Sequence, residues 1–217
     1  GVAHELNNPL TSIVGYTELI SDDVPQGPAR QKLEKMLREA QRMKRIIENL
    51  LRFARQNSLA KKSANLEILL QDVLALREYH LHNNDIEVEV QIEAGLPHVA
   101  LDEDQFKQIL LNLLNNSIDA LEGNSQKRIR IEASCTNGRV TLCFDDNGYG
   151  FADLNRVFDP FYTTKPVGKG TGLGLSICYG IVKEHGGEIH AENLEPHGAR
   201  ISLELPVEIA TFAAQSI

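Results

Sequence analysis

The first 56 residues show the spacing of hydrophobic positions that two amphipathic helices produce. Apolar residues recur at steps of three and four over residues 1–22 and again over residues 29–56. The segment between them, Asp22–Pro28, contains two prolines and a glycine, which end a helix. The pattern therefore predicts an all-α helical hairpin. Because one hairpin cannot bury both apolar stripes, we expect two copies to pair as a dimeric four-helix bundle.

The remaining chain alternates between helical and strand periodicity. Helical spacing is expected from Asn65 to about Tyr79 and again from Leu101 to about residue 122, with Asp102 as the N-cap. Strands are expected at residues 86–92, 128–134, 140–144, 188–192 and 199–205. This order predicts an α+β sandwich with its helices on one face of the sheet. We therefore expect domains at residues 1–57 and 64–207, a linker at 58–63 that acts as a hinge, and a tail at 208–217.

Composition narrows the class of protein. The chain has 217 residues, is 42% hydrophobic and carries a net charge of −8, which favours a buried core and argues against a nucleic-acid-binding surface. Three cysteines without metal-ligand spacing indicate buried free thiols in a reducing compartment. No apolar run reaches the roughly 20 residues of a membrane span, so we expect a cytoplasmic fragment without direct membrane contact. Because Gly1 already lies in helical periodicity, we also expect a missing upstream part.

Five of the glycines between residues 145 and 174 have a spacing that indicates a phosphate site. Gly148 and Gly150, and then Gly170, Gly172 and Gly174, follow one another two apart, which removes side chains where backbone N–H groups could surround an anion. A helical pattern follows at once, so the last glycines would lie at a helix N-terminus that favours negative charge. An isolated pair would more often be a flexible loop. The spacing matches neither a Walker loop nor a dinucleotide fingerprint, so a different ATP-binding fold is required.

Polar residues on two of the predicted helices add candidate chemistry. Asn112 and Asn116 lie four apart on one helix face, where their amide oxygens could meet a hard cation and its phosphates, although a solvated polar cap is the alternative. A lone histidine near a helix end, such as His4, is usually a solvated surface residue. Glu5, however, could accept the imidazole proton as a phosphoryl group arrives, and Asn8 lies one turn from His4, where it could orient a water. A proline follows Asn8 and should bend the helix.

Together these stretches resemble the Bergerat-type ATPases, the superfamily of histidine kinases, Hsp90, type II topoisomerases and MutL. The boxes occur in order at Asn112–Asn116, Asp146–Gly150, Phe158–Lys165 and Gly170–Gly174. The stretch His-Glu-Leu-Asn-Asn-Pro-Leu at residues 4–10 narrows the resemblance to the sensor histidine kinases of two-component systems. Small departures are Ser117, where alanine is common, and Gly198-Ala199, which lacks a frequent threonine.

The resemblance implies a Bergerat ATP-binding fold, ATP and Mg²⁺ as cofactors, and Asn116 as a metal ligand. It also implies a homodimer that autophosphorylates on His4, with catalytic roles for Glu5 and Asn8, and then passes the phosphoryl group to a response-regulator aspartate. Phosphatase activity toward the regulator is left open. Asp146 is expected to select adenine, because a carboxylate can accept a hydrogen bond from the exocyclic amino group. Its neighbour Asp145 should point to the opposite side of the strand.

A mobile lid over the nucleotide is expected at residues 151–170. Phe158 and Phe161 would anchor it on apolar surface, and Lys165 or Lys169 would neutralise phosphate charge. The nucleotide-binding residues expected in full are Asn112, Asn116, Asp119, Asp146, Gly148, Gly150, Phe161, Lys165, Lys169, Gly170, Thr171, Gly172, Leu173 and Gly174. Three alternatives remain at this point: a nucleotide-binding scaffold without kinase activity, an ATPase clamp or chaperone of the same superfamily, and a serine-directed kinase.

Overall fold

The computed structural model describes residues 2–54, 60–166 and 170–207, and within the helices it does not describe the side chains of residues 2–7, 22, 42, 45, 46 and 48–54. The described residues form two compact units. One contains the N-terminal helices together with residues 163–166 and 170–173, and the other contains the remaining described residues. No described helix combines the length and apolar character required to cross a membrane.

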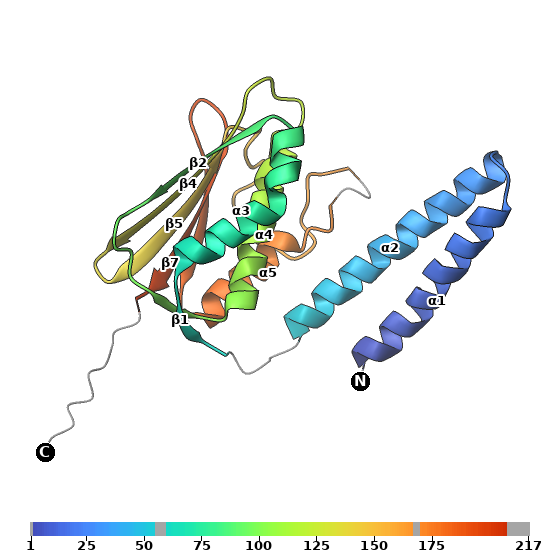
Figure 1. The fold of residues 1–217 in the computed structure, drawn as a ribbon, viewed down its shortest axis with the longest axis horizontal. Coiled ribbons are helices and arrows are strands. Elements are labelled where there is room, and N and C mark those ends of the chain that lie inside the picture. Colours follow the sequence, from blue (N-terminus) through green and yellow to red (C-terminus); the bar gives the residue numbers. More distant parts are fainter. Residues whose placement is uncertain (1, 55–59, 167–169, 208–217) are drawn as a thin grey trace, which may run out of the picture. The chain divides into compact units, whose positions relative to one another are not determined.

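The N-terminal helices form the predicted hairpin. Helix α1 spans Val2–Asp23 and helix α2 spans Pro28–Ala54, which agrees with the predicted limits to within two residues (Figure 1). Leu10 and Ala40 are buried. The hydroxyl groups of Thr17 and Ser21 are satisfied within α1, where each donates to the carbonyl oxygen four residues earlier at 2.7 Å. The helical periodicity of this part of the chain was therefore a sufficient guide to its fold.

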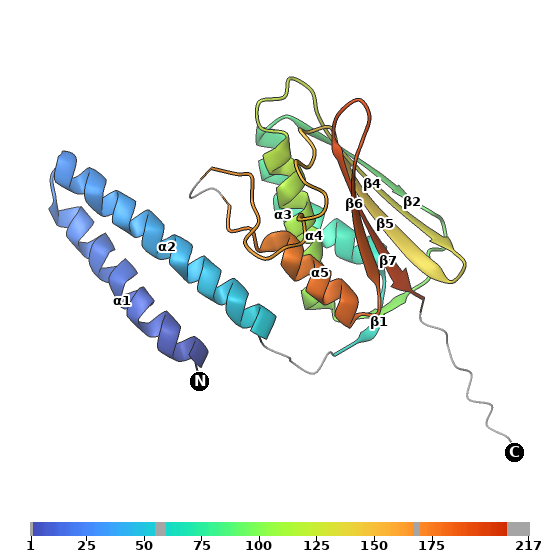
Figure 2. The same cartoon turned by 180° about the vertical axis from the view of Figure 1, so that it is seen from behind.

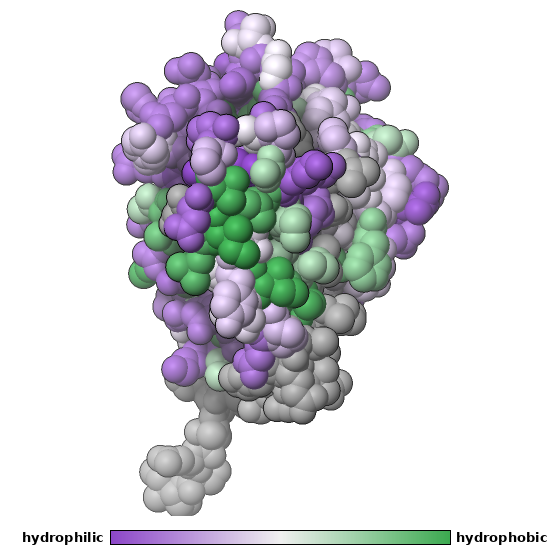
Figure 3. All heavy atoms as spheres, turned by 90° about the vertical axis from the view of Figure 1, so that its right-hand side faces the viewer, coloured by the Kyte–Doolittle hydropathy of each residue, from purple (hydrophilic) through white to green (hydrophobic). Residues whose placement is uncertain are grey.

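A single hairpin leaves many apolar side chains uncovered. In the view of Figure 3, strongly hydrophobic residues gather in one area of the surface. The large hydrophobic residues of the hairpin that are exposed are Ile13, Tyr16, Leu19, Ile20, Met36 and Met43. Isolated apolar side chains on a surface are common, whereas a gathered set indicates an interaction face.

The second unit is a sheet covered by helices on one face. The strand order is β2-β4-β5-β7-β6, and every pair is antiparallel except the parallel pair β2–β4. The strands span Ile86–Ile92 (β2), Lys127–Thr136 (β4), Arg139–Asp146 (β5), Glu188–Asn193 (β6) and Ala199–Pro206 (β7). The helices are α3 (Leu66–Asn83), α4 (Glu103–Ala120) and α5 (Gly174–Glu184), and all three lie on the same side of the sheet (Figure 1, Figure 2). The predicted α+β sandwich is confirmed.

The core of this unit lies between the sheet and the helices. Side chains of the central strands alternate between a buried face and a polar face, as pleated strands require. The buried positions of the three central strands include Ile129, Ile131, Val140, Leu142, Phe144, Leu203 and Leu205, and α4 contributes Phe106, Ile109, Leu110, Leu113 and Leu114. Because β5 lies between β4 and β7, its C-terminal end is held on both sides.

Two short strands were not predicted. Strand β1 (Lys62–Ala64) pairs antiparallel with β3 (Val99–Leu101), so Lys62 and Ser63 belong to a strand of the second unit and the predicted linker is too long at this end. Three residues are too few for alternation to be visible in a sequence. Helix α3 also continues to Asn83, beyond the predicted end near Tyr79, because Leu81 is buried. The predicted tail at 208–217 lies outside the described residues.

The cysteines are free, as expected, but only one is buried. Cys178 is buried, and this raises the pKa of its thiol to about 12. Cys135 and Cys143 are partly exposed, so the expectation that all three are buried is wrong. Cys143 lies on the polar face of β5, whose alternate residues are buried, and position along the strand therefore decides its exposure.

Candidate functional site

The candidate site begins where strand β5 ends against helix α4. Asp146 is the last residue of β5 and is only 8% exposed. Its Oδ1 accepts a hydrogen bond from the Gly148 N–H at 2.9 Å, and the carboxylate also accepts from the Ser117 hydroxyl of α4 and the Ala199 N–H of β7. Burial raises the pKa of Asp146, and these three hydrogen bonds oppose that rise. The carboxylate is thus held by donors from three separate segments.

Asp145 and Asp146 lie on opposite faces of the sheet. Asp146 follows the buried residues Leu142 and Phe144 on the face that the helices cover, whereas Asp145 forms an ion pair with Arg200 on the other face. Both carboxylates are largely buried, so burial alone would not distinguish them. The alternation of the strand does distinguish them, and it supports the choice of Asp146 as the carboxylate that faces the helices.

Asn147 ties the turn after β5 to the neighbouring strand. Its Oδ1 accepts from the Arg128 N–H at 2.8 Å, and its Nδ2 donates to the Gln126 carbonyl oxygen at 2.9 Å. The Asn124 Nδ2 in turn donates to the Asn147 carbonyl oxygen at 2.8 Å. No local pattern in the sequence indicates this role of Asn147, because a tether of this kind depends on residues about 20 positions away. It fixes the direction in which the glycine-rich turn leaves the sheet.

Gly148 and Gly150 are required by packing. A Cβ atom at Gly148 would lie 2.6 Å from the Ala120 carbonyl oxygen, and one at Gly150 would lie 2.8 Å from the Asn193 Oδ1. Gly150 also has a φ of +75°, which favours glycine. The spacing of these glycines predicts clearance for an anion. The structure adds a second reason, because the turn also packs against α4 on one side and against the end of β6 on the other.

Asn193 holds the chain that follows this turn. Its Oδ1 accepts from the Phe151 N–H at 2.6 Å, and its Nδ2 donates to the Phe151 carbonyl oxygen at 2.9 Å. One side-chain amide therefore binds both polar groups of one backbone residue. The sequence offered no signal for this contact, because Asn193 and Phe151 are 42 positions apart.

The asparagines of α4 face the start of helix α5. The Asn112 Nδ2 donates to the Gly174 carbonyl oxygen at 3.3 Å. A Cβ atom at Gly174 would lie 3.9 Å from both Asn112 and Asn116, so the predicted common face of these two residues is confirmed. Helix α5 begins at Gly174, as expected, and the first N–H groups of a helix are available to an anion. Asp119 on the same helix is exposed.

Helices α4 and α5 are joined at their other ends by His185. This residue is 4% exposed; its Nε2 accepts from the Asp102 N–H at 2.9 Å, and its Nδ1 donates to the Ile181 carbonyl oxygen at 2.8 Å. Burial lowers the pKa of His185, in agreement with the neutral tautomer that these two hydrogen bonds require. Asp102 also caps α4, as predicted, because its side chain accepts from the Gln105 N–H at 3.1 Å. The His185 contacts therefore hold the two helices together at the ends opposite the site. They fix the distance between the asparagines of α4 and the start of α5.

The first part of the predicted lid is anchored by Phe158 and not by Phe161. The rings of Phe158 and Tyr179 lie 5.7 Å apart, and the Arg156 guanidinium lies 4.6 Å from the centre of the Tyr162 ring. Phe161, in contrast, is 59% exposed and has a φ of +68°. The predicted anchoring role of Phe161 is therefore wrong. The backbone at this position is in the left-handed region, which a sequence pattern does not reveal.

Residues 163–166 and 170 of the predicted lid, and residues 171–173 after it, belong to the other compact unit. Within residues 163–166 and 170–173, the Thr163 hydroxyl accepts from the Lys165 N–H at 3.2 Å and the Thr171 hydroxyl accepts from the Leu173 N–H at 3.4 Å. Gly172 has a φ of +66°. Lys169 lies outside the described residues. Phosphate contacts from Lys165, Gly170, Thr171, Gly172 and Leu173 stay predictions.

The predicted phosphoacceptor residues lie on helix α1. The side chains of His4 and Glu5 lie outside the described residues, while Asn8 is exposed and its carbonyl oxygen accepts from the Ser12 hydroxyl at 3.2 Å. Pro9 lies inside the helix, as the sequence indicates. Their proposed chemistry therefore rests on the sequence.

The donor set around α4 is suited to a metal ion that arrives with a nucleotide. Amide oxygens such as those of Asn112 and Asn116 are hard ligands of the kind that Mg²⁺ accepts together with phosphate oxygens. Among the residues that the structure describes, no group of three or more His, Cys, Asp or Glu residues could hold a metal. The residues present thus fit a magnesium ion that draws most of its ligands from phosphates and water.

Two protein families match this chain. Residues 101–209 match the family described as histidine kinase-, DNA gyrase B- and HSP90-like ATPase, and residues 1–59 match the His Kinase A (phospho-acceptor) domain. The chain is 36% identical over 212 residues to the sensor histidine kinase ZraS of Escherichia coli O157:H7, and the match covers 96% of this chain and 45% of that protein. It is 31% identical to the signal transduction histidine-protein kinase AtoS of Escherichia coli strain K12, with 95% and 34% covered. The chain thus spans less than half the length of these relatives.

Solved structures agree with these matches. Full-length ShkA in complex with AMPPNP superposes with a TM-score of 0.77 at 26% identity, over 95% of this chain and 44% of that chain. The histidine kinase ThkA in complex with the response regulator protein TrrA gives a TM-score of 0.71 at 28% identity, over 95% of this chain and 60% of that chain.

Proposed function

Because this chain belongs to the histidine kinase-, DNA gyrase B- and HSP90-like ATPase family and is the catalytic core of a sensor histidine kinase, we propose that it binds ATP and transfers the γ-phosphoryl group to His4. The observation that carries the proposal is the arrangement at the end of β5. There the buried Asp146 and the turn of Gly148 lie against α4, whose Asn112 bonds to the start of α5. One site thus brings together a base-selecting carboxylate, amide oxygens and a helix N-terminus.

Each group has a distinct part in nucleotide binding. Asp146 accepts a hydrogen bond from the adenine amino group, which guanine does not offer at that edge. Asn116, with Asn112 beside it, would hold magnesium, and the ion would supply positive charge that offsets the charge of the phosphates. The backbone N–H groups at the start of α5 and the glycines before it bind phosphate oxygens. Asp119 contacts the nucleotide or its water from the exposed edge of α4.

In the transfer step, the two units approach so that His4 reaches the γ-phosphate. An imidazole nitrogen of His4 forms the new N–P bond, the bond between the γ-phosphorus and the β–γ bridging oxygen breaks, and ADP leaves. Glu5 takes the proton that the imidazole loses. Asn8, one turn along α1, orients water when the phosphohistidine is hydrolysed.

We further propose that the phosphoryl group passes to an aspartate of a response regulator. The solved complex of the related kinase ThkA with the response regulator protein TrrA supports a partner of this class. Because ATP and receiver domains are found in the cytoplasm, this part of the protein would work there.

The exposed apolar residues of the hairpin support a homodimer. Tyr16 and Leu19 of α1 and Met36 and Met43 of α2 are each 48% exposed or more, which a second copy would relieve by pairing hairpin against hairpin (Figure 3). The match of residues 1–59 to the phospho-acceptor domain supports the same assembly.

The direct test is phosphate incorporation from γ-labelled ATP. We expect the chain to acquire label in the presence of Mg²⁺, to lose it in acid and to retain it in alkali, because a phosphoramidate bond is acid-labile. Excess EDTA should abolish labelling. Acid-stable label would instead indicate a serine-directed kinase. Tight ATP binding without any label would favour a nucleotide-binding scaffold.

Replacing Asp146 by asparagine should weaken ATP binding about a hundredfold, as expected when a buried charged acceptor loses its hydrogen bonds. Asparagine keeps one acceptor oxygen and replaces the other by an NH₂ group, so it cannot accept hydrogen bonds from the Gly148 N–H, the Ser117 hydroxyl, the Ala199 N–H and the adenine amino group together. Displacement of a fluorescent nucleotide measures the affinity. The control is Asp72→Asn, which makes the same chemical change on α3, where Asp72 pairs with Lys107. Equal affinities of the two variants for ATP would contradict the role of Asp146.

A further inference from the structure

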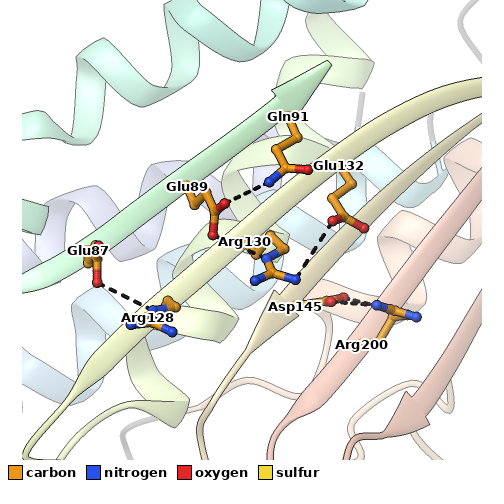
Figure 4. A network of polar contacts seen from close by, with 8 residues as sticks. All are labelled: Glu87, Glu89, Gln91, Arg128, Arg130, Glu132, Asp145 and Arg200. Atoms are coloured by element: carbon orange, nitrogen blue, oxygen red, sulfur yellow. Dashed lines mark hydrogen bonds and ion pairs between the residues drawn. The ribbon is translucent and has the colours of Figure 1, made fainter. Parts of the chain in front are cut away.

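The open face of the sheet carries a series of ion pairs, and one of them differs from the rest (Figure 4). Glu87–Arg128 and Glu89–Arg130 join β2 to β4 at 3.3 Å with side chains at least 42% exposed, and such pairs contribute little to stability. The pair Asp145–Arg200 joins β5 to β7, and its carboxylate is only 12% exposed. Because the Asp145 carboxylate is shielded from water, breaking this third pair would cost more free energy than breaking either exposed pair.

The Asp145–Arg200 contact has the geometry of a clamp. The Arg200 Nε donates to the Asp145 Oδ1 at 2.7 Å, and the Nη2 donates to the Oδ2 at 2.6 Å. Two parallel charge-assisted hydrogen bonds fix both the distance and the angle between the partners. The Arg200 Nη1 also lies 3.5 Å from the Glu192 Oε1 of β6. One guanidinium therefore connects the ends of three neighbouring strands.

The same two backbone segments hold Asp146 on the opposite face. Asp145 precedes Asp146 on β5, and Arg200 follows Ala199 on β7, where Ala199 pairs with Asp146 and its N–H binds the Asp146 carboxylate. A change in the distance between Asp145 and Arg200 would therefore move the Ala199 N–H relative to the carboxylate it holds. Contacts that support a recognition group from behind control its position to within a fraction of an ångström.

We propose that Asp145 and Arg200 are positioning residues for nucleotide recognition. From the far side of the sheet, their clamp sets the position of the Asp146 carboxylate and thereby the preference for adenine. This inference rests on the proposed function, in which Asp146 recognises the adenine amino group. The role is specific to Asp145–Arg200, since Arg200 directly follows Ala199, whose N–H binds the Asp146 carboxylate, whereas the exposed pairs on the same face join β2 to β4.

The test compares two nucleotides on the full chain. Inosine triphosphate carries a carbonyl oxygen in place of the adenine amino group, so the ratio of its dissociation constant to that of ATP isolates adenine recognition. We expect Asp145→Asn and Arg200→Gln each to lower this ratio about tenfold, the effect of weakening one hydrogen bond, with little change in the affinity for inosine triphosphate. Glu87→Gln, which breaks an exposed pair on the same face, should leave the ratio unchanged.

A double variant and the contradicting outcomes complete the test. The double variant should be no worse than the more affected single variant, because both changes remove one interaction. An unchanged ratio, or an equal loss of affinity for both nucleotides, would overturn the positioning role, because general loosening affects both alike. If Asp145→Asn does not fold by circular dichroism, Arg200→Lys, which keeps a cation but loses the bidentate fork, provides the same comparison. Failure of the proposed function is seen separately, as a wild-type chain that does not prefer ATP.

Discussion

Replacing His4 by glutamine is expected to give a chain that binds ATP with unchanged affinity and incorporates no phosphate. Glutamine offers no nucleophilic nitrogen of comparable basicity, and the nucleotide site is built from residues 102–207, which the substitution does not touch. Labelling with γ-labelled ATP in the presence of Mg²⁺ should fall to background, while displacement of a fluorescent nucleotide should match that of the wild-type chain.

The control for His4 is another histidine on the surface. His190 on β6 has a side chain that is 59% exposed, so His190→Gln should fold normally and label fully. Mixing the His4→Gln chain with an Asp146→Asn chain would then show which copy is phosphorylated. Recovery of label in the mixture indicates transfer between the two chains of a dimer, and no recovery indicates transfer within one chain. Label that persists in His4→Gln alone would contradict the assignment of the acceptor.

Sequence patterns were sufficient wherever structure follows from local periodicity. The asparagines of α4 share a face because they lie four apart, and Asp102 caps that helix because it directly precedes it. The alternation of a strand placed Asp145 and Asp146 on opposite sides, and the spacing to Gly148 and Gly150 selected Asp146. In each case the deciding information lies within about one helical turn or two strand residues.

Contacts between distant segments could not be predicted in this way. The tethers formed by Asn147 and Asn193 join residues about 20 and 40 positions apart, and the partner of Asp145 is 55 positions away. The exposed Phe161 depends on a left-handed backbone that most residues avoid, so no residue type signals it. The sequence thus predicts which residues carry the chemistry, and the structure adds the residues that hold Asp146 and the turn after it in place.

Gly198 is the residue whose substitution we expect to damage this arrangement most. Its φ is +121°, and a Cβ atom there would overlap the Asp146 carbonyl oxygen and lie 3.2 Å from the Asn147 Cα. Neither neighbour can move aside easily, because Asp146 pairs with Ala199 in the sheet and Asn147 is tethered to β4. We expect Gly198→Ala to lower the free energy of unfolding of the second unit by about 3–5 kcal/mol, from overpacking together with backbone strain.

Gly138→Ala separates these two causes. Gly138 also has a positive φ, of +74°, but a Cβ atom there meets nothing within 4 Å, so this variant should lose only the roughly 1–2 kcal/mol of left-handed strain. Urea denaturation of the two full-length variants, followed by circular dichroism, measures the difference. At a urea concentration where both remain folded, Gly198→Ala should also bind ATP more weakly, because the displaced carbonyl belongs to Asp146, the residue proposed to recognise adenine. Equal losses of stability in the two variants would mean that β7 can shift away from β5 at little cost, and the rigid placement of Asp146 would then need another source.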